Sequence, residues 1–213
     1  MIVYKKEEMA PSVTGRYPSL EALYNTIIRD TRLHMERVGR YCDAFYHFLW
    51  EQQPDIMGLY FDDVFTDKSE EIFRLHDLGR VYIPNTILNK VEALTDEERR
   101  MINNHTIYAR DAVRAVYDFP YEGRLLEQYL NIALYHHERY DGTGYPEGLA
   151  GEYIPYEARI CAVADVYDGI TSWKPYKTKQ TTKEQAGEII LSEAGRQFDP
   201  QLAELFVKMI PRL

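Results

Sequence analysis

The chain has 213 residues, of which 45% are hydrophobic and 28% charged, a composition typical of a globular domain with its own core. Its formal net charge of -9 argues against binding to DNA, RNA or an anionic membrane, because each favours a basic surface. Two cysteines, no apolar run of membrane-spanning length and a charged N-terminus without a signal region predict a cytoplasmic protein with no membrane segment.

The hydrophobic periodicity is helical almost throughout, and it predicts an all-α protein. Residues 1–18 are predicted to be an irregular lead-in, and residues 19–213 a single domain. In chain order we expect one long helix over 19–52, an Asp-rich loop over 54–68, helices over 69–78, 95–117 and 122–139, a Gly- and Pro-rich loop over 140–156, and a helix over 157–172.

Helix-capping signals mark several of these boundaries. Ser19 is the expected N-cap of the first helix, and Thr95 and Thr182 each begin a capping box. Gly195 is expected to end the helix that follows Thr182, and Asp199 with Pro200 to open the last helix.

Five of the six histidines fall at positions that suggest burial. They are His34, His105, His136 and His137, which lie on apolar helical stripes, and His76, which precedes Asp77. For any one of them alone, a satisfied core histidine is the commoner explanation. Burying several imidazoles without partners is costly, whereas one metal cluster would satisfy them all. The set therefore predicts a metal site, and His47, which lies off its stripe, is predicted to be exposed and remote from it.

Carboxylates accompany the histidines at helical spacing. Asp30 lies four residues before His34, and Asp165 and Asp168 lie three apart in an apolar stretch, so each pair shares a helical face. A cap or a surface charge is the alternative for each. Many imidazoles with a few carboxylates suit Fe, Mn, Ni or Zn better than Mg or Ca.

The order of these residues resembles that of a known family. The motif pieces are His76-Asp77-Leu78-Gly79-Arg80, a distant His105, and His136-His137-Glu138 followed by Asp141-Gly142-Thr143-Gly144-Tyr145-Pro146. Together they resemble the HD-GYP subgroup of the HD hydrolases. The stretches 159–177 and 195–202 are similar to later motifs of that family, and the resemblance extends over residues 19–210.

The resemblance implies a helical bundle with two or three divalent metal ions, often iron or manganese. It implies hydrolysis of cyclic di-GMP, or a related cyclic dinucleotide, to linear pGpG, GMP or both, by attack of a hydroxide that bridges two metals. Asp77 would join those metals, and Asp30 stands where three-metal members carry the longer glutamate. The implied metal ligands are Asp30, His34, His76, Asp77, His105, His136, His137 and Asp165.

Arg80 stands where the family usually has lysine. Either cation can hold a phosphate, but arginine does not readily give up a proton. With Asp77, Arg80 is the expected catalytic residue, while Asp168 or Glu138 could orient the ligand histidines. The expected substrate contacts are Arg80, Gly144, Tyr145, Pro146, Asp168, Lys174 and Lys177.

Two other functions stay open at this point. One is a metal-bearing cyclic-dinucleotide receptor with little or no turnover, and the other is an HD-type phosphohydrolase of a different nucleotide. No sensory or receiver domain is recognisable in the 213 residues. The chain would then act alone, with a separate regulatory protein, or as part of a longer protein.

Overall fold

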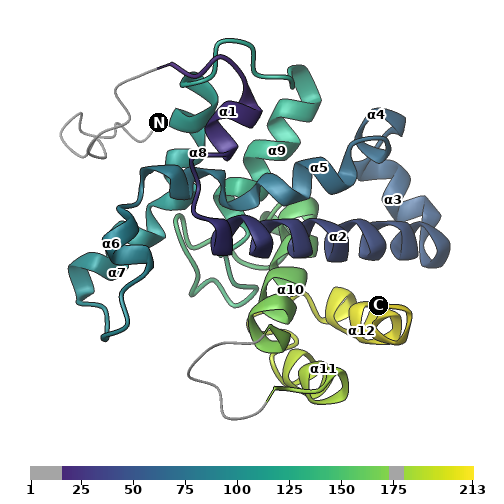
Figure 1. Cartoon of the computed structure of the whole chain (residues 1–213). Coiled ribbons are helices and arrows are strands. Elements are labelled where there is room, and N and C mark those ends of the chain that lie inside the picture. The colour runs from purple at the N-terminus through teal and green to yellow at the C-terminus, as the bar shows by residue number, and fades with distance from the viewer. Residues whose placement is uncertain (1–15, 173–179) are drawn as a thin grey trace.

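The computed structural model describes residues 16–172 and 180–213, and in these ranges the chain forms a helical bundle with only isolated β-bridges (Figure 1). The all-α prediction is confirmed. The α-helices are α1 (Leu20–Tyr24), α2 (Arg29–Gln52), α3 (Pro54–Tyr60), α4 (Asp63–Thr66), α5 (Ser69–Arg74), α6 (Asn85–Leu88), α7 (Asp96–Asn103), α8 (His105–Arg114), α9 (Gly123–Tyr135), α10 (Tyr156–Thr171), α11 (Lys183–Ser192) and α12 (Pro200–Met209). Short 3-10 segments are η1 (Leu75–Tyr82), η2 (Gly151–Tyr153) and η3 (Ile210–Arg212).

Helix α2 runs across the middle of the bundle, with α5 along one side and α10 along the other (Figure 1). Gly39 allows α5 to approach, because a Cβ there would lie 2.9 Å from Arg74 Cβ and 3.0 Å from the Glu70 carbonyl oxygen. The buried face of α2 has the expected helical spacing, with Met35, Val38, Cys42, Phe45 and Leu49 in the core. The packing therefore places the N-terminal half of α2 between η1 and α10.

The prediction of one helix over 19–52 is wrong at residues 25–28, which separate α1 from α2. The Thr26 hydroxyl donates to the Leu23 carbonyl oxygen at 2.7 Å, a local hydrogen bond that competes with the helical pattern. The turn also buries Ile27, which is only 4% exposed. Core packing at one apolar residue thus outweighs the helical propensity of the stretch.

The prediction of a loop over 54–68 is also wrong, because this segment contains α3 and α4. Pro54 occupies the first turn of α3, a position where proline is well tolerated. The Asp62 carboxylate caps α4 by accepting a hydrogen bond from Phe65 N at 3.0 Å. Met57 and Phe65 are fully buried, so their apolar contacts hold these short helices against the core.

Two other predicted helices are interrupted close to the clustered histidines. The helix expected over 69–78 is α5 followed by the 3-10 segment η1, and the one expected over 95–117 is divided into α7 and α8 at Asn104. A Cβ on Gly79 would overlap the His105 carbonyl oxygen, so this glycine permits direct contact between η1 and α8. That contact makes η1, which carries His76, a direct neighbour of α8, which begins at His105.

The predicted N-caps agree with the structure, whereas the C-cap of α11 is Glu193 and not the expected Gly195. Capping boxes are formed at Thr95 and Thr182, and Asp199 caps α12 through the backbone N–H groups of its first turn. Gly195 has φ +76°, in the left-handed region, three residues after α11 ends. The loop expected over 140–156 is irregular apart from η2.

The start of the chain is described only from residue 16. Tyr17 N donates to the Ala115 carbonyl oxygen at 2.6 Å, and the Tyr17 carbonyl oxygen accepts from Tyr117 N at 3.0 Å. The division at residue 18 stays a prediction, since residues 1–15 lie outside the described part. Among the described helices, none combines the length and apolar character needed to cross a bilayer.

Candidate metal centre

The histidines that the sequence singled out converge on one site. With Asp77 and Asp165, they come from elements far apart in the chain: α2, η1, the first residue of α8, the two residues that follow α9, and α10. The side chains that meet there are His34, His76, Asp77, His105, His136, His137 and Asp165. His47 is exposed on α2 and has its own surface partner, as predicted.

Asp77 lies between two sets of imidazoles. Its Oδ1 is 3.0 Å from His105 Nε2 and 3.8 Å from His136 Nε2. Its Oδ2 is 3.5 Å from His76 Nε2 and 3.6 Å from His34 Nε2. One carboxylate therefore presents one oxygen to each set, the arrangement needed to join two neighbouring cations.

Asp165, on α10, also lies close to histidines of both sets. Its Oδ1 is 3.1 Å from His34 Nε2 and 3.9 Å from His76 Nε2, and its Oδ2 is 4.0 Å from His137 Nδ1. Two groups of possible ligand atoms follow, one containing His105, His136 and His137, the other His34 and His76. They have Asp77 in common.

The backbone orients three of the imidazoles. Nδ1 of His76, His105 and His136 lies 3.1, 2.6 and 2.9 Å from a carbonyl oxygen three or four residues earlier. Because a carbonyl oxygen only accepts, each Nδ1 carries the proton and each Nε2 presents its lone pair to the centre of the site. This is the tautomer that a metal ligand needs, and local helical geometry sets it.

Burial leaves polar atoms at this site without hydrogen bonds. Among the described residues, His76 Nε2 and both Asp77 carboxylate oxygens are buried and accept or donate none. Arg80 offsets part of the charge of Asp77, with its Nε 2.7 Å from Oδ2, and a cation bound between the two histidine sets would satisfy the remaining lone pairs. Imidazole nitrogens with two carboxylates are a donor set that suits a divalent transition metal. The residues present therefore fit a metal centre.

The charge states agree with that donor set. Burial and the neighbouring imidazoles hold the pKa of His136 well below its ordinary value and lower the pKa of His137 to about 3, so both rings are neutral. Burial opposes ionisation of Asp77, but the charges of Arg80 and the nearby histidines keep its pKa low. The site thus offers neutral imidazoles and ionised carboxylates, the forms that bind metals.

His34 behaves differently, and a testable consequence follows. Burial alone would lower its pKa, but hydrogen bonds to Asp165 and Asp168 raise it to about 9, so the metal-free ring is protonated near neutral pH. Ligation requires the deprotonated nitrogen, so Mn²⁺ binding at pH 7.5 should release about one proton from this position. Titration calorimetry in buffers of different ionisation enthalpy measures that release. A binding heat independent of the buffer would contradict it.

Asp168 lies next to His34, on the side of its Nδ1 atom. It is 1% exposed, and its carboxylate accepts from His34 Nδ1 at 2.7 Å and from Arg37 Nε at 2.6 Å. These hydrogen bonds keep its pKa below the ordinary value although burial opposes ionisation. The hydrogen bond to His34 supports an orienting role for Asp168, and its expected substrate contact stays a prediction.

Other predicted site residues fall outside the cluster. Asp30 is exposed in the first turn of α2 and belongs to neither ligand group. Lys174 and Lys177 lie outside the described residues. Arg37 was missed, although its position three residues after His34 places both on one face of α2 and could have indicated it.

Glu138 shapes the glycine-rich loop instead of orienting a histidine. Its buried carboxylate accepts from the backbone N–H groups of residues 147, 148 and 149 at 2.7, 3.0 and 3.1 Å. The Tyr145 ring packs on His137, with ring centroids 5.0 Å apart. Burial and the charge of Asp77 raise the pKa of Tyr145, so its hydroxyl keeps its proton near the metal site. Pro146 follows and is half-buried.

Gly144 is required where this loop folds back. A Cβ there would lie 2.5 Å from Glu138 Cα and would overlap Arg139 N, so backbone must move. We expect Gly144→Ala to lower the free energy of unfolding by about 1–3 kcal/mol, as for other overpacked sites. Urea titration measures this. Gly58→Ala is the control, because a Cβ on that exposed residue of α3 would lie 4.0 Å from the Trp50 ring, an ordinary van der Waals contact. Equal stability of both variants would contradict the prediction.

Comparison with known proteins defines the class of this fold and site. Residues 70–202 match the sequence model of the HD domain, which is more than half of the chain. The chain therefore belongs to the HD domain family. HD domains bind divalent metal ions, in agreement with the histidine and aspartate cluster of the described residues.

Individual relatives confirm the resemblance drawn from the motifs. The chain is 35% identical to the cyclic di-GMP phosphodiesterase response regulator RpfG of Xanthomonas campestris pv. campestris, with 84% of this chain and 47% of RpfG covered. It is 33% identical to the 3'3'-cGAMP-specific phosphodiesterase 2 of Vibrio cholerae, with 91% of this chain and 35% of that protein covered. The chain thus spans less than half the length of these curated relatives.

A solved structure shares the fold. Bd1817, a HDG"Y"P protein from Bdellovibrio bacteriovorus, aligns with a TM-score of 0.58 over 90% of this chain and 56% of its own, at 18% identity. The overall arrangement of helices is therefore shared with that protein.

Proposed function

We propose that this chain is a metal-dependent phosphodiesterase that hydrolyses cyclic di-GMP or a related cyclic dinucleotide. The observation that carries the proposal is the pair of ligand groups that share Asp77. Relatives named as cyclic di-GMP and 3'3'-cGAMP phosphodiesterases support the substrate class. From cyclic di-GMP the product is then linear pGpG, GMP or both.

Two divalent ions, Fe or Mn in preference to Ni or Zn, fit the two ligand groups. His105, His136 and His137 would hold one, His34 and His76 the other, with Asp77 common to both. Asp165 faces both groups and completes the set. The exposed position of Asp30 gives no support to a third ion. When bound, the metals would lower the pKa of a water molecule and neutralise negative charge on the phosphoryl oxygens.

Arg80 provides positive charge at the mouth of the site. Its Nε lies 2.7 Å from Asp77 Oδ2, and 24% of its side chain is exposed. Burial opposes its charge, but Asp77 and Asp165 keep its pKa above the ordinary value, so the guanidinium stays protonated. It would therefore bind a phosphoryl oxygen and would not protonate the leaving oxygen. Tyr145, with its protonated hydroxyl, would donate to the same substrate from the loop.

Turnover by purified protein tests the proposal. The protein is prepared under reducing, anaerobic conditions, loaded with Mn²⁺ or Fe²⁺, and incubated with cyclic di-GMP and with 3'3'-cGAMP. We expect chromatography to show the linear dinucleotide or the mononucleotides, and His47→Ala to retain this activity because it lies away from the cluster. Binding without hydrolysis would instead indicate a receptor. Hydrolysis of other nucleotides alone would indicate a different HD phosphohydrolase.

The setting of the reaction is part of the proposal. Cyclic di-GMP is a bacterial intracellular messenger, so its hydrolysis would take place in the cytoplasm. The chain spans less than half of its curated relatives, and it would act alone, with a separate regulatory protein, or as part of a longer protein. Activity of the 213-residue chain with and without added regulators compares these possibilities.

A further inference from the structure

Asp168 accepts four side-chain hydrogen bonds beside the metal site. In addition to His34 Nδ1, its Oδ2 accepts from Arg37 Nη2 at 3.0 Å, while its Oδ1 accepts from Arg37 Nε at 2.6 Å and from Ser172 Oγ at 3.0 Å. The two arginine bonds form a fork on one carboxylate, which fixes its plane as well as its position. Asp168 is therefore held rigidly between α2 and α10.

We propose that Arg37 and Asp168 form a positioning pair that holds His34 as a metal ligand. This inference rests on the proposed metal-dependent function. His76, His105 and His136 are oriented by carbonyl oxygens of their own helical segments, but His34 Nδ1 meets a carboxylate 134 residues away in the chain. With that bond formed, His34 Nε2 lies 3.1 Å from Asp165 and 3.6 Å from Asp77, in the ligand group it shares with His76.

A carboxylate partner strengthens His34 as a ligand more than a backbone carbonyl oxygen would. A carboxylate that accepts from the far nitrogen of an imidazole raises the basicity of the ligating nitrogen, and loss of such a partner typically weakens metal affinity 10–100-fold. Asp168 should thus strengthen the ligand group of His34 and His76 selectively. Among the described residues, no hydrogen bond connects Asp168 with the other group, which contains His105, His136 and His137.

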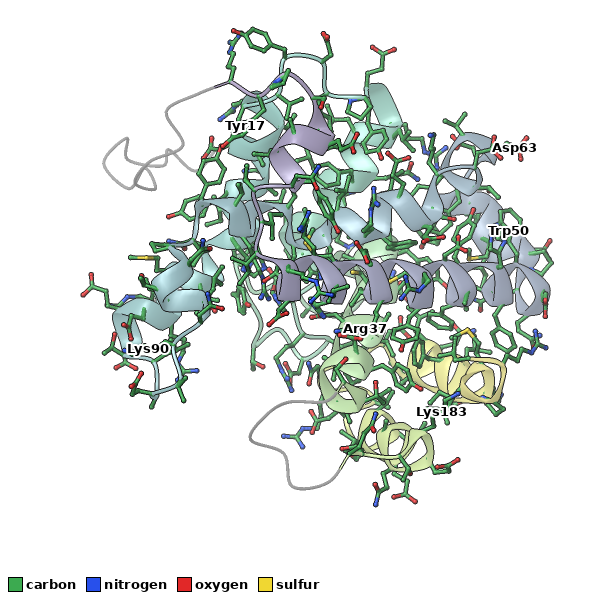
Figure 2. The ribbon with its side chains drawn as sticks, viewed as in Figure 1. Tyr17, Arg37, Trp50, Asp63, Lys90 and Lys183 are labelled. Carbon is green, nitrogen blue, oxygen red and sulfur yellow. The ribbon has the colours of Figure 1, made fainter. Side chains whose placement is uncertain are left out.

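The side chain of Arg37 extends from Asp168 to the protein surface. Its side chain is 32% exposed and borders a cavity of about 450 Å³ with Tyr41, Tyr167 and Lys183. Figure 2 shows Arg37 at the junction of α2 and α10, with Lys183 further along at α11. A lysine at position 37 could neutralise Asp168 but could not form the fork, so the shape of the guanidinium matters as well as its charge.

The alternative is that the Arg37–Asp168 pair only holds α2 and α10 together. The chain offers a matched control for this structural role. Arg159 of α10 forms a buried ion pair with Asp199, at 2.6 Å, which ties α10 to α12 in the same way. Asp199→Asn removes one charge from a buried arginine pair without touching the metal cluster. Asp168→Asn makes the same change beside His34.

Calorimetric titration of the metal-free full chain with Mn²⁺, together with thermal unfolding, tests the proposal. For Asp168→Asn we expect one of two binding steps to weaken 10–100-fold and the other to persist. Arg37→Lys should weaken the same step less, and it serves if the first variant folds poorly. Asp199→Asn should lower thermal stability yet leave both binding steps unchanged.

The outcomes separate this inference from the proposed function. If Asp168→Asn and Arg37→Lys bind Mn²⁺ as the wild type does, and change only in thermal stability as Asp199→Asn does, the pair is a structural tie and the proposal is wrong. Equal weakening of both steps also overturns it. A wild type that binds two ions but hydrolyses no cyclic dinucleotide contradicts the proposed function alone. A wild type that binds no Mn²⁺ overturns both.

Discussion

Asp77→Ala should reduce hydrolysis of cyclic di-GMP to background and remove most of the bound metal. Asp77 is the only residue shared by both ligand groups of the described residues, and its two oxygens face different imidazoles. Its loss removes one ligand and one negative charge from each group at once. Neither His76 nor His105 can replace it, because their Nδ1 atoms are engaged by the backbone.

Metal analysis after gel filtration and a turnover assay measure this result. Asp77→Asn tests whether charge matters as well as shape, since the amide keeps the volume but loses the anion, and we expect it to be nearly as inactive. Asp111→Ala is the control, because Asp111 is a half-exposed aspartate of α8 that pairs with Arg114 at the surface. The metal-free Asp77→Ala protein should remain folded and lose the gain in Tm that added Mn²⁺ gives the wild type. Full metal content with full activity would show that Asp77 is not the shared ligand.

Arg80→Ala should lower kcat/KM on the order of 10²-fold or more, as when one donor to a developing charge is removed. In the protein as described, Arg80 is paired with Asp77 Oδ2. When cations balance that carboxylate, the charge of Arg80 becomes available to the scissile phosphate. Because its pKa lies above the ordinary arginine value, Arg80 does not act as a proton donor. Arg80→Lys should therefore change the rate only modestly.

Steady-state kinetics at matched metal content test the role of Arg80. Metal analysis of each variant is needed, since removal of a cation beside Asp77 also changes the electrostatics of the ligand group. Arg114→Ala, a change at an exposed arginine of α8, is the control and should leave kcat/KM unchanged. A wild type that binds cyclic di-GMP without hydrolysing it, and gains turnover on Arg80→Lys, would show that this position must supply a proton. It would also favour the receptor function.

Much of the metal site was predictable because ligand chemistry restricts residue types strongly. Several histidines on apolar helical faces have few explanations other than a shared cation, and the pairs at 76–77 and 136–137 are adjacent in the chain. The structure brings these residues together with His34, His105 and Asp165, as expected. The helix caps at Thr95, Thr182 and Asp199 were equally predictable, because a cap depends on side chains within one helical turn.

The partners of His34 could not be predicted from helical spacing alone. Asp30 and Arg37 share the face of α2 that carries His34, one turn before it and one turn after it. The sequence alone suggested Asp30, which is exposed and outside both ligand groups, and it missed Arg37. The packing of α10 against α2 decides between them, because it brings Asp168 to His34 and Arg37.

Residue chemistry and helical spacing by themselves therefore determined the all-α class, the N-caps and the set of histidines expected to cluster, while the family resemblance added Asp77 as their shared partner. Only the tertiary structure decided the break at residues 25–28, the role of Glu138 in the loop and the pairing of Arg37 with Asp168. The physical reason is how far apart in the chain the interacting residues lie. Caps and shared helical faces depend on residues three or four apart, whereas a buried carboxylate finds its donors through helix packing between positions more than a hundred residues apart.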